Sequence, residues 1–312
     1  CHRQNVRGSC DHGTCDHGTD PAFAEGLGRG CIRMKKITAF LLTLLALVFV
    51  FPVLFLAVGS LMGKNELTDL LLPVLKTGST GYASWKLFPE YPTLRSYVEV
   101  LLDSPEFFVM FWNSVKITLG ALAGELLVGM PAAWGFAKFD FPGKKGLFTL
   151  YIALMMMPFQ VMLLGNYLVL DDLRLLDSLL GIILPAVFST FPVFIMYRFF
   201  EGIPLALLEA ARLDGAGELR LFFMIAIPLG SPGVISAMVL GFLEYWNLIE
   251  QPMVFLKTKE LWPLSLYLPN IDMDHAGTAF AASMVALIPA VLVFFAGQDY
   301  LEQGIVSTAV KE

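Results

Sequence analysis

The sequence has few charged side chains for its length. Only 15% of its 312 residues are Asp, Glu, Lys or Arg, whereas 56% are hydrophobic, and the mean hydropathy is +0.68. Soluble globular domains carry about 25% charged residues. The apolar residues are gathered in long blocks, which indicates contact with lipid. The net charge is −6 and no basic stripe is present, so we expect no nucleic-acid partner.

Cysteine is absent after position 31, and histidine is nearly absent. The four cysteines (1, 10, 15 and 31) and three of the four histidines precede Met34. Closely spaced Cys and His can bind zinc. We favour instead a disordered or non-native N-terminal extension over residues 1–33, because Met34-Lys-Lys followed by an apolar run is typical of a protein start. The fold prediction therefore concerns one transmembrane domain, residues 34–312.

The motifs of common catalytic sites are also missing. The sequence contains no HExxH metalloprotease motif and no Walker A nucleotide-binding sequence. His275 lies beside Asp272 and Asp274 and could contribute to a metal site, although a solvated loop is the simpler interpretation. A membrane enzyme is therefore a less favoured class, and we expect this chain to hold no catalytic residue, no metal and no cofactor.

Six apolar blocks are long enough to cross a bilayer, which takes about 20 mostly apolar residues per helix. Several contain proline, which membrane helices tolerate and which is expected to kink them. A buried soluble helix would explain any one block but not six. We predict an all-α polytopic membrane protein with six transmembrane helices, at about 37–60, 107–136, 147–170, 178–200, 222–248 and 278–298.

Lysine and arginine are concentrated in the loops on one side of this array. They lie at 33–36 before the first block, at 138–145 after the second and at 198–220 after the fourth. The loop after the third block, 171–177, is mostly acidic. By the positive-inside rule the basic side is cytoplasmic. Both termini are therefore predicted to be cytoplasmic.

Ionisable residues inside the blocks leave one alternative open. Glu125 is the one acid near the middle of a block, whereas Lys116 and Glu244 lie nearer an end. Lys116 and Glu125 are separated by about 900° of helix and should face opposite sides. An ion-coupled secondary transporter could use Glu125, but it would also be expected to contain inverted repeats, and none is evident.

Residues 201–221 predict a short helix, a turn and a second helix at the cytoplasmic surface. Pro204 suits the first turn of a helix, and Gly215 suits the position just past its end. Glu218 then falls in the first turn of the next helix, where its charge complements the helix dipole. Glu209 and Arg212 are three residues apart and can pair with each other or with a partner.

This segment carries a resemblance to a known family. Glu209-Ala-Ala-Arg-Leu-Asp214-Gly215, followed by Ile225-Ala-Ile227-Pro228, resembles the EAA motif of bacterial ABC importer permeases, here 209–228 with Ile227 in place of Leu. The chain from Met34 onward is similar to carbohydrate permeases such as the maltose permease subunit MalG. The segments that carry this similarity include Asn113-Ser114, Ala132–Lys144, Met157-Pro158, Trp246-Asn247 and Gly297-Gln298. Glu125 and Asp299 depart from the family pattern.

The resemblance implies a permease subunit of an ATP-driven importer that moves a small solute, a sugar or alternatively a non-sugar solute, across the bacterial cytoplasmic membrane. It implies a second homologous permease, two cytoplasmic ATPase subunits that hold ATP and Mg²⁺, and an extracytoplasmic solute-binding protein. The helix would dock in the ATPase, with Glu209 bonding it, Gly215 forming the turn and Asp214 bracing that turn. The implied coupling residues are Glu209, Ala210, Ala211, Asp214 and Gly215.

Polar and aromatic residues at the outer ends of the third and fifth blocks are candidates for the solute path. Side chains of this kind can bind a sugar by hydrogen bonds and ring stacking. Tyr245 and Trp246 are also explained by an interfacial aromatic belt. The candidate path residues are Asn166, Tyr167, Glu244, Tyr245, Trp246 and Asn247.

Overall fold

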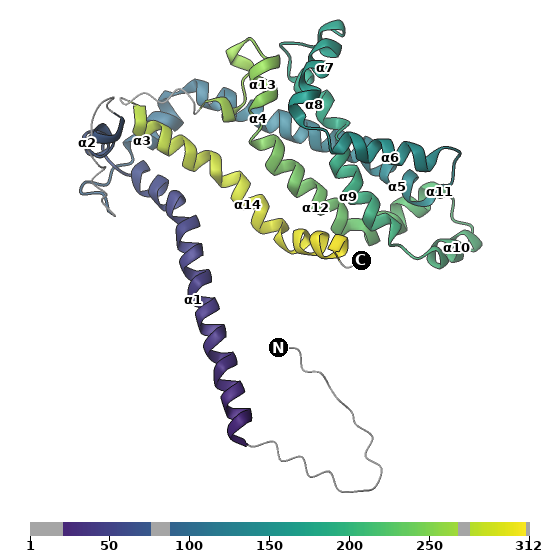
Figure 1. Cartoon of the computed structure of the whole chain (residues 1–312). Helices are drawn as coiled ribbons and strands as arrows, with labels where there is room; N and C mark the ends of the chain where they lie inside the picture. The colour runs from purple at the N-terminus through teal and green to yellow at the C-terminus, as the bar shows by residue number, and fades with distance from the viewer. Residues whose placement is uncertain (1–20, 76–87, 268–274, 310–312) are drawn as a thin grey trace. The chain divides into compact units, whose positions relative to one another are not determined.

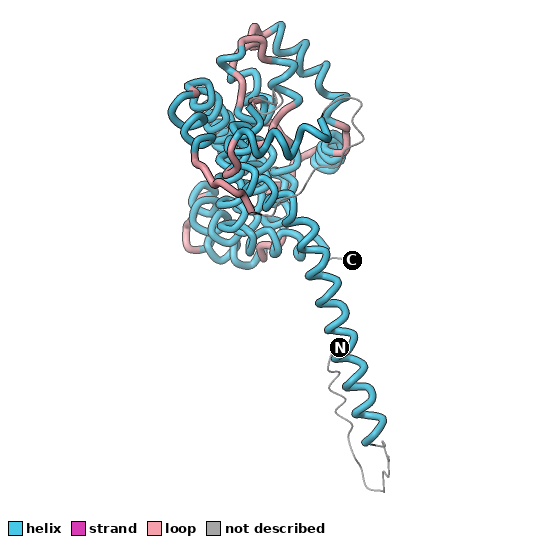
Figure 2. The backbone as a smooth tube through the Cα atoms, turned by 90° about the vertical axis from the view of Figure 1, so that its left-hand side faces the viewer, coloured by secondary structure: helices cyan, strands magenta, loops and turns pink. Residues whose placement is uncertain are grey.

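The computed structural model describes residues 21–75, 88–267 and 275–309 (Figure 1), and these residues form helices and loops without strands (Figure 2). The chain divides into two units, Cys1–Phe55 and Leu56–Glu312, which are described separately. The prediction of an all-α polytopic protein is confirmed over the described residues.

The first unit consists mainly of helix α1, Pro21–Ser60, whose last turn belongs to the second unit. Its segment Lys36–Ser60 is 25 residues long and apolar enough to span a membrane. Large apolar side chains such as Phe40 and Phe49 are exposed along it, as expected for a lipid-facing helix. The helix begins at Pro21, within the range 1–33 that we predicted to be a disordered or non-native extension.

The second unit is a helical bundle in which α12 is central. Helix α12, Ile227–Trp246, packs against α14, α9 and α4. The other elements are α2 Lys64–Leu75, α3 Arg95–Val98, η1 Glu99–Asp103, α4 Pro105–Gly124, η2 Glu125–Gly129, α5 Met130–Lys138, α6 Lys144–Met155, α7 Phe159–Asp172, α8 Leu179–Val187, α9 Thr190–Glu201, α10 Leu205–Leu213, α11 Glu218–Leu221, η3 Phe222–Ala226, α13 Glu250–Phe255, η4 Lys259–Leu261, η5 Leu264–Leu266 and α14 Ala276–Ala309.

Among the described residues, five continuous helical segments are long and apolar enough to cross a membrane, and the number is six if one bent pair of helices is counted as a span. The continuous segments are Lys36–Ser60, Pro105–Lys138, Leu179–Glu201, Glu218–Trp246 and Ala276–Glu302. Each overlaps one of the predicted blocks. Pro105–Lys138 and Glu218–Trp246 contain single turns of π-helix, at η2 and η3 respectively, a local widening that often accompanies functional sites.

The block predicted as one helix over 147–170 is instead two helices, α6 and α7, bent by 105° at a short break. Pro158 causes this break. Its ring disfavours helical geometry at Met157, and Pro158 itself has ψ 136°, far from the helical value. The third block is therefore a bent pair of helices, and its bend is far larger than the kink expected from proline.

Small residues let the helices approach closely. Gly230 and Gly233 of α12 lie against Phe200 and Phe199 of α9, and a Cβ at either glycine would come within 2.4 Å of a phenylalanine ring atom. Membrane helices gain little hydrophobic driving force from one another, so close packing of this kind supplies much of their association.

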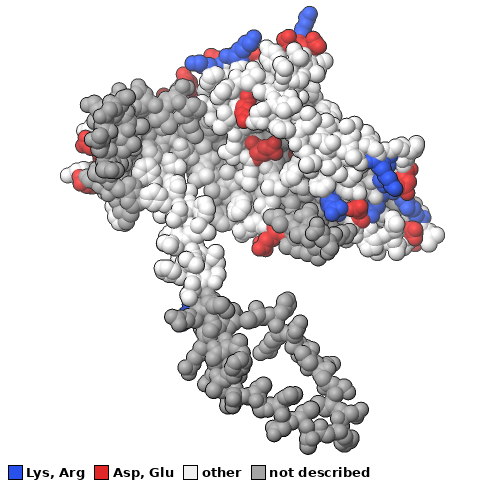
Figure 3. Space-filling model, viewed as in Figure 1, with Lys and Arg blue, Asp and Glu red and all other residues white. Residues whose placement is uncertain are grey.

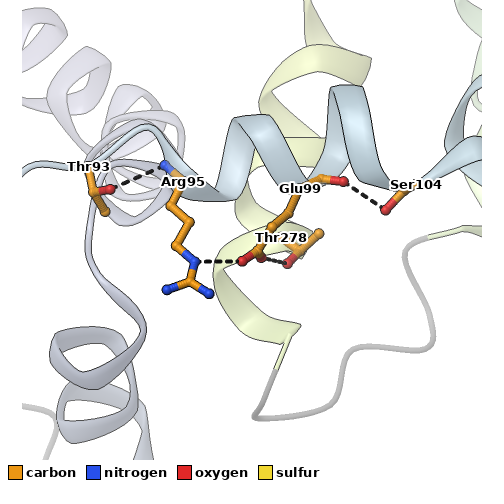
Figure 4. Close-up of polar contacts among 5 residues, drawn as sticks. All are labelled: Thr93, Arg95, Glu99, Ser104 and Thr278. Atoms are coloured by element: carbon orange, nitrogen blue, oxygen red, sulfur yellow. Dashed lines mark hydrogen bonds and ion pairs between the residues drawn. The ribbon is translucent and has the colours of Figure 1, made fainter.

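Polar contacts join the loops at one end of the bundle. Glu99 of η1 accepts hydrogen bonds from Arg95 Nε at 3.0 Å and from Thr278 Oγ1 of α14 at 3.3 Å (Figure 4). Asp177, in the α7–α8 loop, accepts from the backbone N–H groups of Lys257 and Thr258 at 2.9 and 2.8 Å. The Thr258 hydroxyl also donates to Asp177 Oδ2, at 2.6 Å. This side-chain bond, together with the two backbone bonds, holds the pKa of Asp177 below its usual range.

Most of the charged side chains visible in Figure 3 lie at the ends of the second unit, around α7 and α13 and around α10 and α11, and the surface between them is mostly uncharged apart from a few acidic side chains. This arrangement is the one expected of a membrane-spanning bundle, because the hydrocarbon core disfavours charge.

Candidate functional site

The turn after α10 has a backbone geometry that requires glycine. Gly215 has φ +84°, in the left-handed region that other residues enter only with strain. Gly215 N–H donates to Arg212 O at 3.0 Å, and Ala216 N–H donates to Ala211 O at 3.0 Å. These two bonds form a Schellman motif, which closes the helix and satisfies its last carbonyls.

Leu208 holds α10 against the bundle. Its side chain is fully buried, in a cluster with Phe200, Leu221 and Phe222. Residues 209 and 210 on the opposite side of the helix are exposed, and Ala211 is half-buried. The segment is therefore a rigid projection with an open outer face.

Of the two pairings left open for Glu209 and Arg212, the structure does not form the one between them. Arg212 pairs with Glu218 across the turn, at 3.0 Å, and not with Glu209. No side chain in the described ranges pairs with the Glu209 carboxylate, which remains open to solvent. Asp214 is the C-cap of α10, and its backbone N–H donates to Ala210 O at 3.1 Å. Exposed Leu213 (90% exposed) and Leu219 add apolar surface beside these charges.

Lys138 is a positioning residue that the sequence analysis used only for orientation. It ends α5, and its ammonium donates to the carbonyls of Glu201 at 3.2 Å and Ile203 at 2.7 Å. These carbonyls lie at the end of α9, immediately before α10. The second span thereby fixes the start of the projecting helix. No local sequence signal could reveal a pair of bonds across more than sixty residues.

A cavity of about 850 Å³ lies among the interrupted spans, within the usual size of small-molecule sites. Its walls come from the α6–α7 bend, from the break between α8 and α9 at Phe188 and Ser189, and from the end of α12. Irregular backbone at membrane depth is tolerated where it lines such a cavity.

Three of the six candidate path residues line this cavity: Asn166 from α7, and Glu244 and Tyr245 from α12. Gln251 of α13 joins them, and the sequence analysis had missed it. Its side-chain oxygen is buried without a hydrogen-bond partner among the described residues.

The other three candidates lie outside the cavity wall. Tyr167 packs its ring on Phe255, with centroids 6.3 Å apart. Trp246 is buried, and its indole donates to Ala286 O at 2.9 Å. Asn247 donates to Leu243 O at 2.8 Å, which closes the end of α12. Tyr167 and Trp246 therefore belong to the packing of the bundle, and Asn247 caps its own helix. Successive side chains of a helix point about 100° apart, so neighbours of the lining residues can lie outside the wall.

Glu125 is completely buried at the π-turn η2. Tyr245 donates its phenol proton to Glu125 Oε1 at 2.5 Å, while Glu125 Oε2 has no partner among the described residues. Lys116 is exposed, in agreement with the expectation that these two residues face different sides. Glu125 is therefore anchored behind the cavity wall by the tyrosine that lines it.

The described residues contain no group of three or more metal-ligating side chains. The metal interpretation involved Asp272 and Asp274, and the zinc interpretation involved the histidines and cysteines near the N-terminus. Both aspartates, and all of those residues up to position 20, lie outside the described residues.

Sequence comparison identifies relatives over most of the chain. A family model described as "binding-protein-dependent transport system inner membrane component" matches residues 125–307. The arabinooligosaccharides transport system permease protein AraQ of Bacillus subtilis is 30% identical over 276 residues, which cover 86% of this chain and 92% of AraQ. The lactose transport system permease protein LacG of Rhizobium radiobacter is 27% identical, over 86% of this chain and 93% of LacG.

The fold also matches a solved structure. A chain of a bacterial ABC transporter involved in the import of the acidic polysaccharide alginate superposes with a TM-score of 0.75 at 23% identity. The match covers 87% of this chain and 98% of that one. At this identity the similarity establishes the fold.

Proposed function

Because the chain belongs to the family of binding-protein-dependent transport system inner membrane components, we propose that it is the permease of an ATP-driven importer that carries a sugar into the cytoplasm. The observation that carries this proposal is the family match over 125–307, which includes the Gly215 turn and the whole of α12. Relatives named for arabinooligosaccharide and lactose transport support a sugar as the solute.

The chain itself is a non-catalytic subunit, and its partners supply the energy. We propose that α10 docks in one of two cytoplasmic ATPase subunits, which bind ATP and Mg²⁺. Glu209 is exposed and free to accept hydrogen bonds from the ATPase, and Leu213 and Leu219 add apolar contact. The Schellman turn at Gly215 keeps α10 rigidly joined to α12, so a movement of the ATPase is transmitted to the span that lines the cavity.

The proposed orientation places α10 and both termini in the cytoplasm. Lys138, Lys144 and Lys145 lie at the same end of the second unit as α10, and Lys138 bonds directly to the segment before it. Basic residues at that end support a cytoplasmic location by the positive-inside rule. The Asp177 contact then lies on the outer side, where a second permease and a solute-binding protein complete the proposed transporter.

Uptake by the complete transporter in liposomes tests this proposal. The chain is co-expressed with the second permease, ATPase and binding protein of neighbouring genes, and radiolabelled arabinotriose and lactose are the probes. We expect uptake that requires ATP and the ATPase subunits and that persists when ion gradients are dissipated. Uptake driven by a proton or sodium gradient without ATPase would instead support a secondary transporter that uses Glu125. ATP-dependent uptake of a different solute alone would support the non-sugar alternative.

A further inference from the structure

The polar side chains of the cavity wall include one carboxylate and no cation among the described residues. They are Asn166, Ser189, Thr190, Glu244, Tyr245 and Gln251, and no Lys, Arg or His is among the described lining residues. Glu244 is the one charged group in the wall, and it is exposed. An anion inside would therefore meet a carboxylate and no compensating cation.

Two side-chain groups of the cavity wall accept hydrogen bonds and lack a donor among the described residues: the Glu244 carboxylate and the Gln251 amide oxygen. The Gln251 oxygen is buried. The Tyr245 phenol, which could have donated into the cavity, is turned to Glu125 Oε1. Buried acceptors of this kind are normally satisfied by a donor, from protein, water or ligand. Hydroxyl groups of a neutral sugar supply such donors, whereas carboxylate, sulfate and fully ionised phosphate groups do not.

We propose that this cavity admits neutral, hydroxyl-rich solutes and rejects anionic ones, with Glu244 as the residue that sets this selectivity. Glu125 is a positioning residue in this arrangement, because it accepts the hydrogen bond of the Tyr245 phenol and so keeps that donor out of the cavity. Only one part of this inference rests on the proposed function, namely that the molecule in the cavity is the transported solute. The charge selectivity follows from the side chains that line the cavity.

Cysteine labelling measures this selectivity without knowledge of the natural solute. The four native cysteines all precede Met34, so they are replaced by serine in the full chain, and Asn166→Cys places one thiol in the cavity wall. The complete transporter is treated with a cationic methanethiosulfonate (trimethylammonium) or an anionic one (sulfonate) of similar size. The ratio of the two reaction rates is compared with the ratio for free 2-mercaptoethanol in the same buffer.

We expect the cationic reagent to be favoured by on the order of fivefold beyond the free-thiol ratio, because a nearby carboxylate attracts one reagent and repels the other. Glu244→Gln should return the ratio to that of the free thiol. Glu106→Gln is the matched control, because Glu106 lines a separate, smaller pocket, and it should leave the ratio raised.

A ratio equal to the free-thiol value, or one that Glu244→Gln leaves unchanged, would overturn the proposal. Ser189→Cys, in the α8–α9 break, is the second reporter. If neither thiol reacts with either reagent, the cavity is closed to solutes and the proposal is wrong. Charge-selective labelling in a protein that shows no ATP-dependent uptake would refute the transport function and leave the cavity selectivity standing.

Discussion

Replacement of Gly215 by valine isolates the contribution of one backbone turn to energy coupling. The φ of +84° places this residue in the left-handed region, which costs an L-residue about 1–2 kcal/mol and is least tolerated by a β-branched side chain. An added Cβ meets no described atom within 4 Å, so steric collision contributes nothing. A penalty of this size lowers the population of the native turn by about 5- to 30-fold.

The assay compares ATP hydrolysis with solute uptake by the complete transporter in liposomes. In Gly215→Val, the two Schellman bonds from Gly215 and Ala216 are weakened, so α10 is no longer held rigidly to α12. We expect fewer solute molecules to be carried per ATP hydrolysed, while assembly of the complex is retained because Leu208 remains buried. Gly215→Asn should restore much of the coupling, since Asn tolerates the left-handed conformation.

A neighbouring glycine provides a matched control. Gly217 is also exposed and also has open space around it, but its φ of −75° is accessible to any residue. Gly217→Ser should couple normally, because Ser is favoured at the start of a helix, whereas Gly215→Ser should be impaired. Normal uptake per ATP in Gly215→Val at normal expression would refute the reasoning. Equal damage from serine at both positions would show that surface contact, and not backbone geometry, matters there.

Three further predictions concern the rest of the chain. Lys138→Met should weaken the junction before α10 by about 1.5–3 kcal/mol, the usual strength of hydrogen bonds to a charged group, and so lower the unfolding temperature of the purified complex. Lys144→Met is the control: it removes only a surface contact of 3.4 Å to a neighbouring acid and should change the unfolding temperature little. Asp177→Ala should destabilise the complex at neutral pH. Because the folded pKa of Asp177 lies below the unfolded value of about 3.9, the part of this loss due to the carboxylate should persist above that value and disappear as the pH falls through the folded pKa. A part independent of pH should remain, because alanine tolerates the φ of 57° at this position less well than Asp, and thermal melts at several pH values would separate the two parts. Asn247→Ala should leave uptake unchanged, since its amide bonds within α12, and a large loss of uptake without loss of binding-protein stimulation of the ATPase would return Asn247 to the solute path.

The local features of this protein could be predicted from the sequence because their causes are local. Length and apolar composition identify a spanning helix wherever its neighbours lie. The Gly215 turn was predictable because a left-handed helix end has a strong residue preference. Proline signalled an irregularity in the third span, but a kink and a bend of 105° have the same local signature. The size of the bend depends on what packs against each half.

Pairs of side chains could not be predicted where the course of the chain decides which groups meet. Arg212 had two acids within reach, and the direction taken by the chain after Gly215 brought Glu218 to it and left Glu209 free.

The sequence by itself determined the class of protein, the positions of its spans and the turn at the projecting helix, because hydrophobic burial in lipid and backbone preferences act on neighbouring residues. Only the tertiary structure decided that Glu244 and Tyr245 share a cavity wall with Gln251 while Trp246 and Asn247 do not. It also brought Lys138 to the carbonyls before α10 and Glu125 to the hydroxyl of Tyr245. These contacts join residues far apart in the chain, and the packing of entire helices selects among the many pairs that composition allows.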